Sequence, residues 1–236
     1  MKRDGEAGGA PEAGGAPEAS RAPEASRKAE HMAFRAVVFD IGGVLEFTPA
    51  MGMAEKWEDR LGLGRGELPE RLGAVFAAGN VGALTEPEIH GRIGQILALS
   101  PAVVAAFMAD LWTEYLGTLN VELTTYFAGL RPAYRTGIIS NSFVGARERE
   151  QERYGFEQLT DDIVYSHEVG ICKPDLRIYE LACDRLGVRP EEMIFLDDVE
   201  PNVAAACDLG AHGILFTSTA QAIADISASL GRPPAT

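Results

Sequence analysis

Four polar groups of residues could carry out chemistry, because each directly follows an apolar run. They are Asp40, Ser140 with Asn141, Lys173, and Asp197 with Asp198. Where parallel strands end at one edge of an open sheet, residues far apart in the sequence meet in one crevice. A carboxylate there can ligate a metal ion, attack an electrophile, or do both. We therefore predict that the four groups form one site.

The carboxylates predict a magnesium ion. Asp197 and Asp198 are adjacent, and neighbouring carboxylates repel each other unless a cation or a proton lies between them. Together with Asp40 they would form an oxygen-rich, partly hydrated site of the kind that Mg²⁺ prefers. Asn202 could support these ligands or cap the following helix. The alternative role for Asp40 alone is a helix cap or a turn residue.

Ser140, Asn141 and Lys173 predict an anion site. A hydroxyl and backbone N–H groups ahead of a helix can hold phosphate, although Ser and Asn also cap helices. An ammonium held in place before Pro174 could bind phosphate and reduce its repulsion from Asp40. The alternative for Lys173 is an ordinary solvated lysine.

The elements that must position these residues are strands that alternate with helices. The expected strands are 34–40, 136–140, 162–166, 193–197 and 213–216, and the expected helices are 144–154, 175–186, 201–209 and 218–230. Buried strands that alternate with helices indicate an α/β fold with a parallel, doubly wound sheet.

One long segment interrupts this alternation. Between about residues 50 and 135 only amphipathic helical patterns occur, and this length is far above that of ordinary loops. We predict a helical cap over 49–131, inserted into a Rossmann-like core of 32–48 and 132–236. A cap over the site could exclude water and contact the substrate, whereas the alternative is a helical layer that only covers the sheet. Candidate substrate-contacting residues are Trp57, Arg60, Arg65 and Trp112.

The first 31 residues differ from the rest in composition. Residues 8–13 and 14–19 both read Gly-Gly-Ala-Pro-Glu-Ala, and such small, Pro-rich and charged repeats have little apolar surface to bury. We therefore expect residues 1–31 to form a disordered tail that is neither a signal peptide nor a transit peptide. Met32 is then a candidate start of the native chain.

Charge and cysteine content limit the partners and the compartment. The net charge is −14, and the tail holds five basic and six acidic residues, so about −13 belongs to the rest. This balance argues against nucleic acid and anionic membranes, and no apolar run approaches the ~20 residues that span a bilayer. Three cysteines without paired or metal-ligand spacing fit a reducing cytoplasm. The sequence predicts no oligomeric state.

The order of the four groups resembles that in the haloacid dehalogenase-like hydrolase superfamily, over essentially all of 34–230. The matching segments are Val-Val-Phe-Asp-Ile-Gly-Gly-Val-Leu, Ile-Ile-Ser-Asn-Ser, Gly-Ile-Cys-Lys-Pro-Asp-Leu-Arg-Ile-Tyr and Phe-Leu-Asp-Asp-Val-Glu-Pro-Asn. The helical segment resembles the cap of the first subclass. The details resemble most the branch that contains bacterial glucose-1-phosphatase-type enzymes and the phosphatase domain of epoxide hydrolases.

The resemblance implies hydrolysis of a small phosphorylated metabolite, for example a sugar phosphate. Asp40 would attack phosphorus, and water would then hydrolyse the aspartyl-phosphate. Mg²⁺ would be held by Asp40, the backbone carbonyl of Gly42 and Asp198, with Asp197 close by or acting through water. The residues that would hold the phosphoryl group are Ser140, Asn141 and Lys173.

Gly42 departs from the pattern of the superfamily. Most phosphatases of the superfamily have a second Asp at the position of Gly42. That Asp protonates the leaving oxygen and later activates water. General acid–base catalysis contributes about 10²–10⁴-fold, so we expect a leaving group that needs little protonation, a substitute acid, or low activity. A sugar 1-phosphate or an acyl phosphate would fit the first. Glu46 is the candidate for the second. His167 is another titratable residue near the crevice, for which a surface histidine is the favoured alternative.

Two other functions stay open. In a haloacid dehalogenase the aspartate displaces halide from carbon, and Gly42 is compatible with this because halide needs no proton. The pair Asp197 and Asp198 argues the other way, since a metal-free reaction has no use for clustered acids. The second alternative is a regulatory or scaffold protein that has lost most of its phosphatase activity. The presence of Asp40, Lys173 and Asp198 argues against it.

Overall fold

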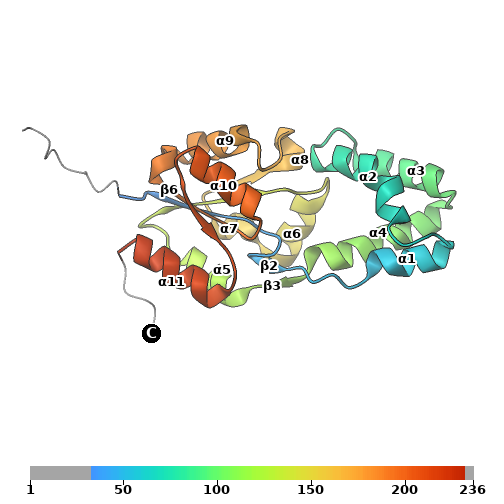
Figure 1. Cartoon of the computed structure of the whole chain (residues 1–236), viewed down its shortest axis with the longest axis horizontal. Helices are drawn as coiled ribbons and strands as arrows, with labels where there is room; N and C mark the ends of the chain where they lie inside the picture. The colour runs from blue at the N-terminus through green and yellow to red at the C-terminus, as the bar shows by residue number, and fades with distance from the viewer. Residues whose placement is uncertain (1–32, 232–236) are drawn as a thin grey trace, which may run out of the picture. The chain divides into compact units, whose positions relative to one another are not determined.

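The computed structural model of the protein describes residues 33–231 (Figure 1). A five-stranded sheet forms its centre, with the strand order β5-β4-β1-β6-β7 and parallel pairing throughout. The strands are β1 (Ala36–Phe39), β4 (Arg135–Ser140), β5 (Asp162–Tyr165), β6 (Met193–Asp197) and β7 (His212–Leu215). The predicted α/β fold is confirmed, and each expected strand agrees with an observed one to within two residues at either end.

Alternating side chains of β1 explain why helices cover both faces of the sheet. Val37 and Phe39 belong to one hydrophobic cluster, and Ala36 and Val38 belong to another. Successive side chains of a strand point to opposite faces, and all four are fully buried. Figure 1 shows the covering helices α9 (Leu176–Leu186) and α10 (Glu200–Asp208) on one side, and α5 (Val121–Ala128) and α11 (Thr219–Ser229) on the other.

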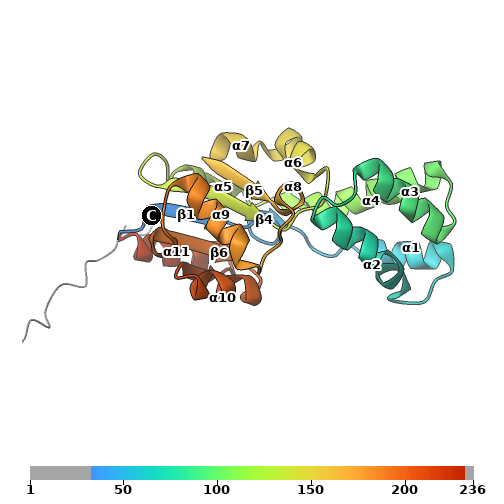
Figure 2. The ribbon, with the colours of Figure 1, turned by 90° about the horizontal axis from the view of Figure 1, so that it is seen from above.

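Four helices between β1 and β4 form a unit that we call the helical insert. They are α1 (Met53–Leu61), α2 (Glu67–Asn80), α3 (Glu86–Leu97) and α4 (Pro101–Leu116), and they lie together at one end of the sheet in Figure 2. The insert has a hydrophobic cluster of its own, in which Trp57 meets Phe107 edge-on at 5.2 Å between ring centroids. An antiparallel pair of short strands, β2 (Glu46–Phe47) and β3 (Thr118–Leu119), joins the insert to the sheet domain.

Helix α5 lies elsewhere than expected. It falls within the predicted cap 49–131, but Leu123 and Phe127 pack in the cluster on the sheet, and Phe127 stacks on Phe39 at 4.5 Å. The insert proper therefore ends near Leu116. The helical pattern indicates that one face is buried but not which element buries it, and this is why the sequence did not separate α5 from the preceding helices.

The remaining elements are short. They are α6 (Ala146–Tyr154), α7 (Phe156–Leu159), α8 (Ser166–Val169) and the 3₁₀ turn Pro190–Glu192. Within residues 33–231 no single helix is long and apolar enough to cross a membrane, and α3 with α4 meets that test only as a pair bent by 112°. The expected disordered tail, residues 1–31, lies outside the described residues.

Candidate active site

The ends of three neighbouring strands meet beside Asp40. The strands β4 and β6 flank β1, and Phe39 pairs with Ile138 on one side and with Leu196 on the other. The N–H group of Asp40 then donates to the carbonyl of Leu196 at 2.9 Å. As a result, ligand oxygens of Asp40, Asp197 and Asp198 all lie within 4.8 Å of one another.

Lys173 is buried between two of these carboxylates. Its Nζ lies 2.7 Å from Oδ1 of Asp40 and 2.6 Å from Oδ2 of Asp197, and it donates to the carbonyl of Ile139 at 2.9 Å. The side chain is 1% exposed, so the alternative of a solvated surface lysine is wrong. The lysine neutralises part of the charge that would otherwise repel an anionic substrate.

Asn141 and Ser140 have different roles in this arrangement. The Asn141 side chain donates to the carbonyl of Lys173 at 2.9 Å and accepts from its N–H group at 2.7 Å. Its amide is therefore used to position Lys173, and its backbone is what remains for an anion. The hydroxyl of Ser140, in contrast, makes no side-chain hydrogen bond to any other described residue, and Ser140 lines the pocket described below.

The two adjacent aspartates are also distinct. Asp197 is fully buried and accepts hydrogen bonds from the N–H group of Val199 at 2.8 Å and from Nδ2 of Asn202 at 3.1 and 3.2 Å. With Lys173 as a further donor, both of its oxygens are occupied. Asp198 is exposed as a residue. The surrounding protein still removes part of the water from its carboxyl group, and this desolvation, together with the charge of Asp197, raises its pKa. Asp198 is thus the more accessible ligand of the pair.

Asp40 is held through one of its two oxygens. Its Oδ1 accepts from the N–H group of Ile41 at 2.7 Å and faces Lys173, while Oδ2 accepts no hydrogen bond from the described residues. Burial raises the pKa of Asp40 to about 7, Lys173 opposes this rise, and the charge of Asp197 adds to it. A cation beside Oδ2 would favour the ionised form.

The glycines after Asp40 are not equivalent. Gly43 has a φ of +78°, and a Cβ atom there would lie 2.1 Å from Oδ2 of Asp198, so both conformation and space require glycine. At Gly42 a Cβ atom would meet nothing within 4 Å, and the φ angle lies outside the left-handed region. The missing carboxylate at residue 42 is therefore a chemical feature that packing does not impose.

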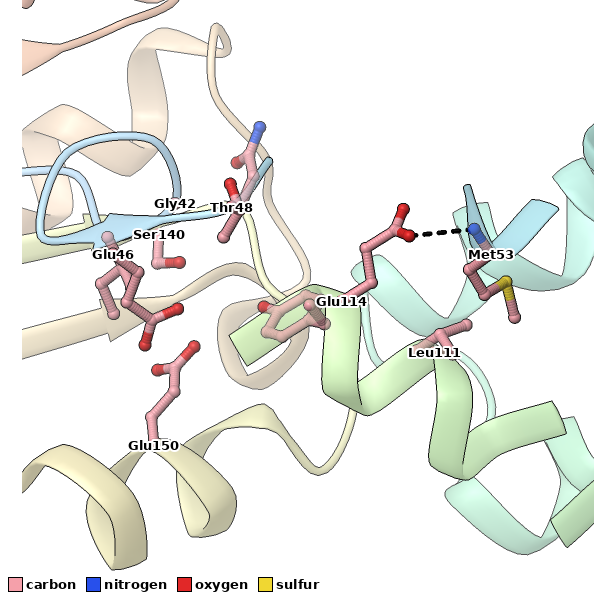
Figure 3. Close-up of a pocket in the computed structure, with 11 residues that line it drawn as sticks. Gly42, Glu46, Thr48, Met53, Leu111, Glu114, Ser140 and Glu150 are labelled. Carbon is pink, nitrogen blue, oxygen red and sulfur yellow. Dashed lines mark hydrogen bonds between the residues drawn. The ribbon is translucent and has the colours of Figure 1, made fainter. Parts of the chain in front are cut away.

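A pocket of about 380 Å³ opens beside this turn and extends to the helical insert (Figure 3). Its walls combine residues of the sheet domain and of the insert, among them Gly42, Glu46, Ser140, Glu150, Met53, Leu111, Glu114 and Tyr115. The insert thus contributes to a cavity that begins next to Asp40, as a substrate-contacting cap would.

The expected substrate-contacting residues of the cap do not line this pocket. Trp57 and Trp112 are buried in the core of the insert. Arg60 lies over the ring of Trp57 at 4.5 Å, and Arg65 pairs with Asp59 at 2.8 Å. Met53 of α1 lines the pocket, together with three residues that share one face of α4. These three, Leu111, Glu114 and Tyr115, have the i, i+3 and i+4 spacing of a helix face, which is the signal that the sequence offered.

Glu46, predicted as a substitute acid, lines the pocket, and a second glutamate faces it. Glu46 is 1% exposed and Glu150 is fully buried; Figure 3 shows their carboxyl groups pointing toward each other. Burial raises the pKa of Glu46 to about 9, with a further contribution from the charge of Glu150 and an opposing one from Arg153. Burial also raises the pKa of Glu150 to about 7, against the hydrogen bond from Tyr165.

Glu150 was not among the residues predicted from the sequence. Glu150 follows Ala146 by four residues, and both are buried on one face of α6, so the spacing of that helix was the available signal. His167 does not line the pocket. Its Nδ1 lies 2.7 Å from the hydroxyl oxygen of Ser142.

The burial of Glu46 predicts a pH-dependent stability. Its folded-state pKa is raised, so its contribution is complete below the unfolded value of 4.5 and is lost as pH rises toward about 9. From about pH 5 to about pH 8 the unfolding free energy of the wild type should fall relative to that of Glu46→Gln by at least ~1 kcal/mol. Denaturant titrations at both pH values measure this, with Glu148→Gln on the exposed face of α6 as control. Parallel pH profiles of wild type and Glu46→Gln would contradict the assignment.

The fold is an open parallel α/β sheet with an acidic cluster at the carboxyl ends of its strands, and sequence comparison identifies the family. The family model of the haloacid dehalogenase-like hydrolases matches residues 34–210. The chain therefore belongs to this family, is an enzyme, and is a hydrolase. The resemblance that the four motifs indicated is confirmed.

Two relatives match most of this chain. The chain is 30% identical over 213 residues to acyl-CoA dehydrogenase family member 10 of Mus musculus, covering 85% of this chain and 20% of that protein. It is 26% identical over 222 residues to bifunctional epoxide hydrolase 2 of Rattus norvegicus, covering 85% and 39%. The chain thus spans well under half the length of these relatives.

A smaller relative and a solved structure match over nearly their whole length. D-ribitol-5-phosphate phosphatase of Bacteroides thetaiotaomicron is 23% identical, with 74% of this chain and 87% of that protein covered. The structure of an enzyme of the same family and organism, in complex with magnesium and inorganic phosphate, superimposes with a TM-score of 0.66 at 21% identity, covering 78% of this chain and 94% of that chain. At this identity the structural match supports the fold.

Proposed function

We propose that the protein is a Mg²⁺-dependent phosphomonoester hydrolase in which Asp40 is the nucleophile. The observation that carries this proposal is the state of the Asp40 carboxylate. Ile41 and Lys173 hold Oδ1, and Oδ2 has no partner among the described residues. A carboxylate fixed through one oxygen can present the other to phosphorus, and water then hydrolyses the aspartyl-phosphate.

The acidic cluster fits the proposed metal ion. Its ligand oxygens lie within 4.8 Å of one another, and carboxylate and carbonyl oxygens are the ligands that Mg²⁺ accepts. Asp40, Asp198 and the carbonyl of Gly42 would hold the ion, which would supply neutralisation of the phosphoryl charge. Because the oxygens of Asp197 are occupied, we assign Asp197 the role of positioning Lys173.

The phosphoryl group would be held by residues from β4 and from the segment before α9. The Lys173 ammonium opposes negative charge next to Asp40, the Ser140 hydroxyl can donate to a phosphoryl oxygen, and the backbone N–H group of Asn141 can do the same. Phosphoryl transfer depends chiefly on such positioning and charge neutralisation. The pocket of about 380 Å³ suits a small phosphorylated metabolite, which agrees with the D-ribitol-5-phosphate phosphatase among the relatives. A cytoplasmic location and the lack of nucleic-acid or membrane partners stay predictions.

A metal-supplemented screen against small phosphomonoesters tests this function. We expect release of inorganic phosphate in the presence of Mg²⁺ and its loss in excess chelator. Halide release from 2-haloacids, measured in parallel, tests the dehalogenase alternative. Halide release that survives the chelator, without phosphate release from any phosphomonoester, would replace the proposal with that alternative.

The open space at Gly42 allows a direct test of the missing acid. A Cβ atom at residue 42 would meet nothing within 4 Å, so we expect Gly42→Asp to raise kcat on alkyl phosphates ~10-fold or more, within the range of general acid–base catalysis. Aryl phosphates with acidic leaving groups should respond much less. Gly42→Asn is the matched control, since it has the same shape but carries no proton to transfer. Equal gains in the two variants, or on the two substrate types, would contradict a missing acid.

A further inference from the structure

Two buried carboxyl groups of the pocket, Glu46 and Glu150, are assigned no step in the reaction proposed above. Glu46 belongs to β2 and Glu150 to α6, so residues more than a hundred positions apart converge at one place. Figure 3 shows both side chains on the same side of the pocket, near Gly42 and Ser140. Folding has thus placed the two carboxyl groups in the same pocket as Gly42, close to Asp40 in the sequence.

Each of the two carboxyl groups has an oxygen without a partner. Oε2 of Glu150 accepts from the hydroxyl of Tyr165 at 2.7 Å. Oε1 of Glu150 and Oε1 of Glu46 are buried and have no hydrogen-bond partner among the described residues. Buried polar atoms are almost always paired in folded proteins, so two such acceptors in one pocket indicate a donor that a ligand brings.

The cations near the pair are engaged elsewhere. Lys173 is bound to Asp40 and Asp197. Arg153 influences Glu46 electrostatically, but its side chain is exposed and donates to the carbonyl of Gly117 at 3.2 Å. Two buried carboxylates are disfavoured unless a proton or a cation lies between them, and no residue within 33–231 places a cation there.

We propose that Glu46 and Glu150 bind an ammonium group on the leaving part of the substrate, which makes the substrate a small amino-alcohol or amino-sugar phosphate. This rests on the proposed phosphatase function. An ammonium has three N–H donors and a positive charge, so one group can serve both unpartnered oxygens. A hydroxyl has a single donor and no charge, and it can serve only one of them. The pocket next to Ser140 lets the same ligand reach the phosphoryl site.

Size-matched substrate pairs test the proposal. We compare kcat/KM for 2-aminoethyl phosphate with 2-hydroxyethyl phosphate, and for glucosamine 6-phosphate with glucose 6-phosphate. In at least one pair the wild type should favour the amine by tenfold or more. Glu46→Gln and Glu150→Gln should each remove most of this preference through a higher KM for the amine, and Glu148→Gln, which changes an exposed acid of the same helix, should retain it. No amine preference in either pair, or a preference that both Gln variants retain, would overturn the proposal.

A binding measurement separates this inference from the phosphatase function. Calorimetric titration of Asp40→Asn with the same four ligands requires no turnover. Tighter binding of the amines that is lost with the additional Glu150→Gln substitution would support the ammonium site even if no phosphate is released by the wild type. Phosphate release without any difference in binding between the amines and their hydroxyl counterparts would support the phosphatase function and overturn the ammonium site.

Discussion

Replacing Asp40 with asparagine is expected to reduce kcat for phosphate release by ~10³-fold or more, in line with the loss of other catalytic nucleophiles. Asparagine has the shape of aspartate but cannot form the phosphorylated intermediate. It also removes one of the oxygens proposed to hold Mg²⁺. Since Asp197 remains as a partner of Lys173, the variant should stay folded, and this separates a lost reaction from a lost structure.

Steady-state and single-turnover phosphate release measure this effect. The control is Asp208→Asn, which makes the same change on the exposed end of α10 and should leave kcat unchanged. Turnover of Asp40→Asn within tenfold of the wild type would exclude Asp40 as the nucleophile, whatever the other residues of the site do.

Replacing Lys173 with methionine is expected to affect both stability and activity. Methionine is of similar length but has no charge, so Asp40 and Asp197 would be left buried without their cation. Breaking a buried ion pair in this way costs about 3–5 kcal/mol. Lys173 is proposed to neutralise negative charge beside Asp40, so its loss should also lower kcat/KM by ~10²-fold or more, as removal of one preorganised electrostatic group does.

The pH dependence of the Lys173→Met variant gives an independent check. Lys173 lowers the pKa of Asp40, so without the ammonium the pKa of this carboxyl group in the folded state should rise further above its unfolded value. Such groups stabilise the fold at low pH and lose that contribution as pH rises, so the deficit in unfolding free energy should shrink from about pH 8 to about pH 5. Lys56→Met is the control, because its ion pair with Asp110 is largely exposed and is worth at most ~1 kcal/mol. Equal effects of the two substitutions would contradict the buried role of Lys173.

Much of the sheet domain follows directly from the sequence. The strands β1 and β6 are apolar on both faces, and such runs indicate a central parallel strand whatever surrounds them. Because the carboxyl ends of parallel strands share one edge, the proximity of Asp40 to Asp197 and Asp198 could be predicted without knowing any distance.

The site residues contributed by other elements could not be predicted in the same way. Glu150 and Tyr115 lie on helices, and the position of a helix around a sheet depends on packing that periodicity does not encode. Trp57 and Trp112 were candidates for contact with the substrate, but both are buried in the hydrophobic cluster of the insert. The close approach of the Gly43 backbone to the Asp198 carboxylate is likewise visible only in three dimensions.

Glycine at residue 42 should also affect how long the proposed aspartyl-phosphate intermediate persists. A Cβ atom at residue 42 would meet nothing within 4 Å. In the proposed reaction, glycine at this position leaves the first step without an acid at residue 42 and the second step without a base there. Slow hydrolysis of the aspartyl-phosphate should follow, and the intermediate should accumulate during turnover. Gly42→Asp should reduce that accumulation.

Detection of this intermediate tests the central claim most directly. The wild-type protein is mixed with Mg²⁺ and a substrate that it hydrolyses, quenched in acid during turnover, digested, and analysed by mass spectrometry. We predict a phosphoryl adduct on the peptide that contains Asp40, present in the wild type and absent in Asp40→Asn. Phosphate release by the wild type without any adduct at Asp40, or with an adduct on a different residue, would contradict the account.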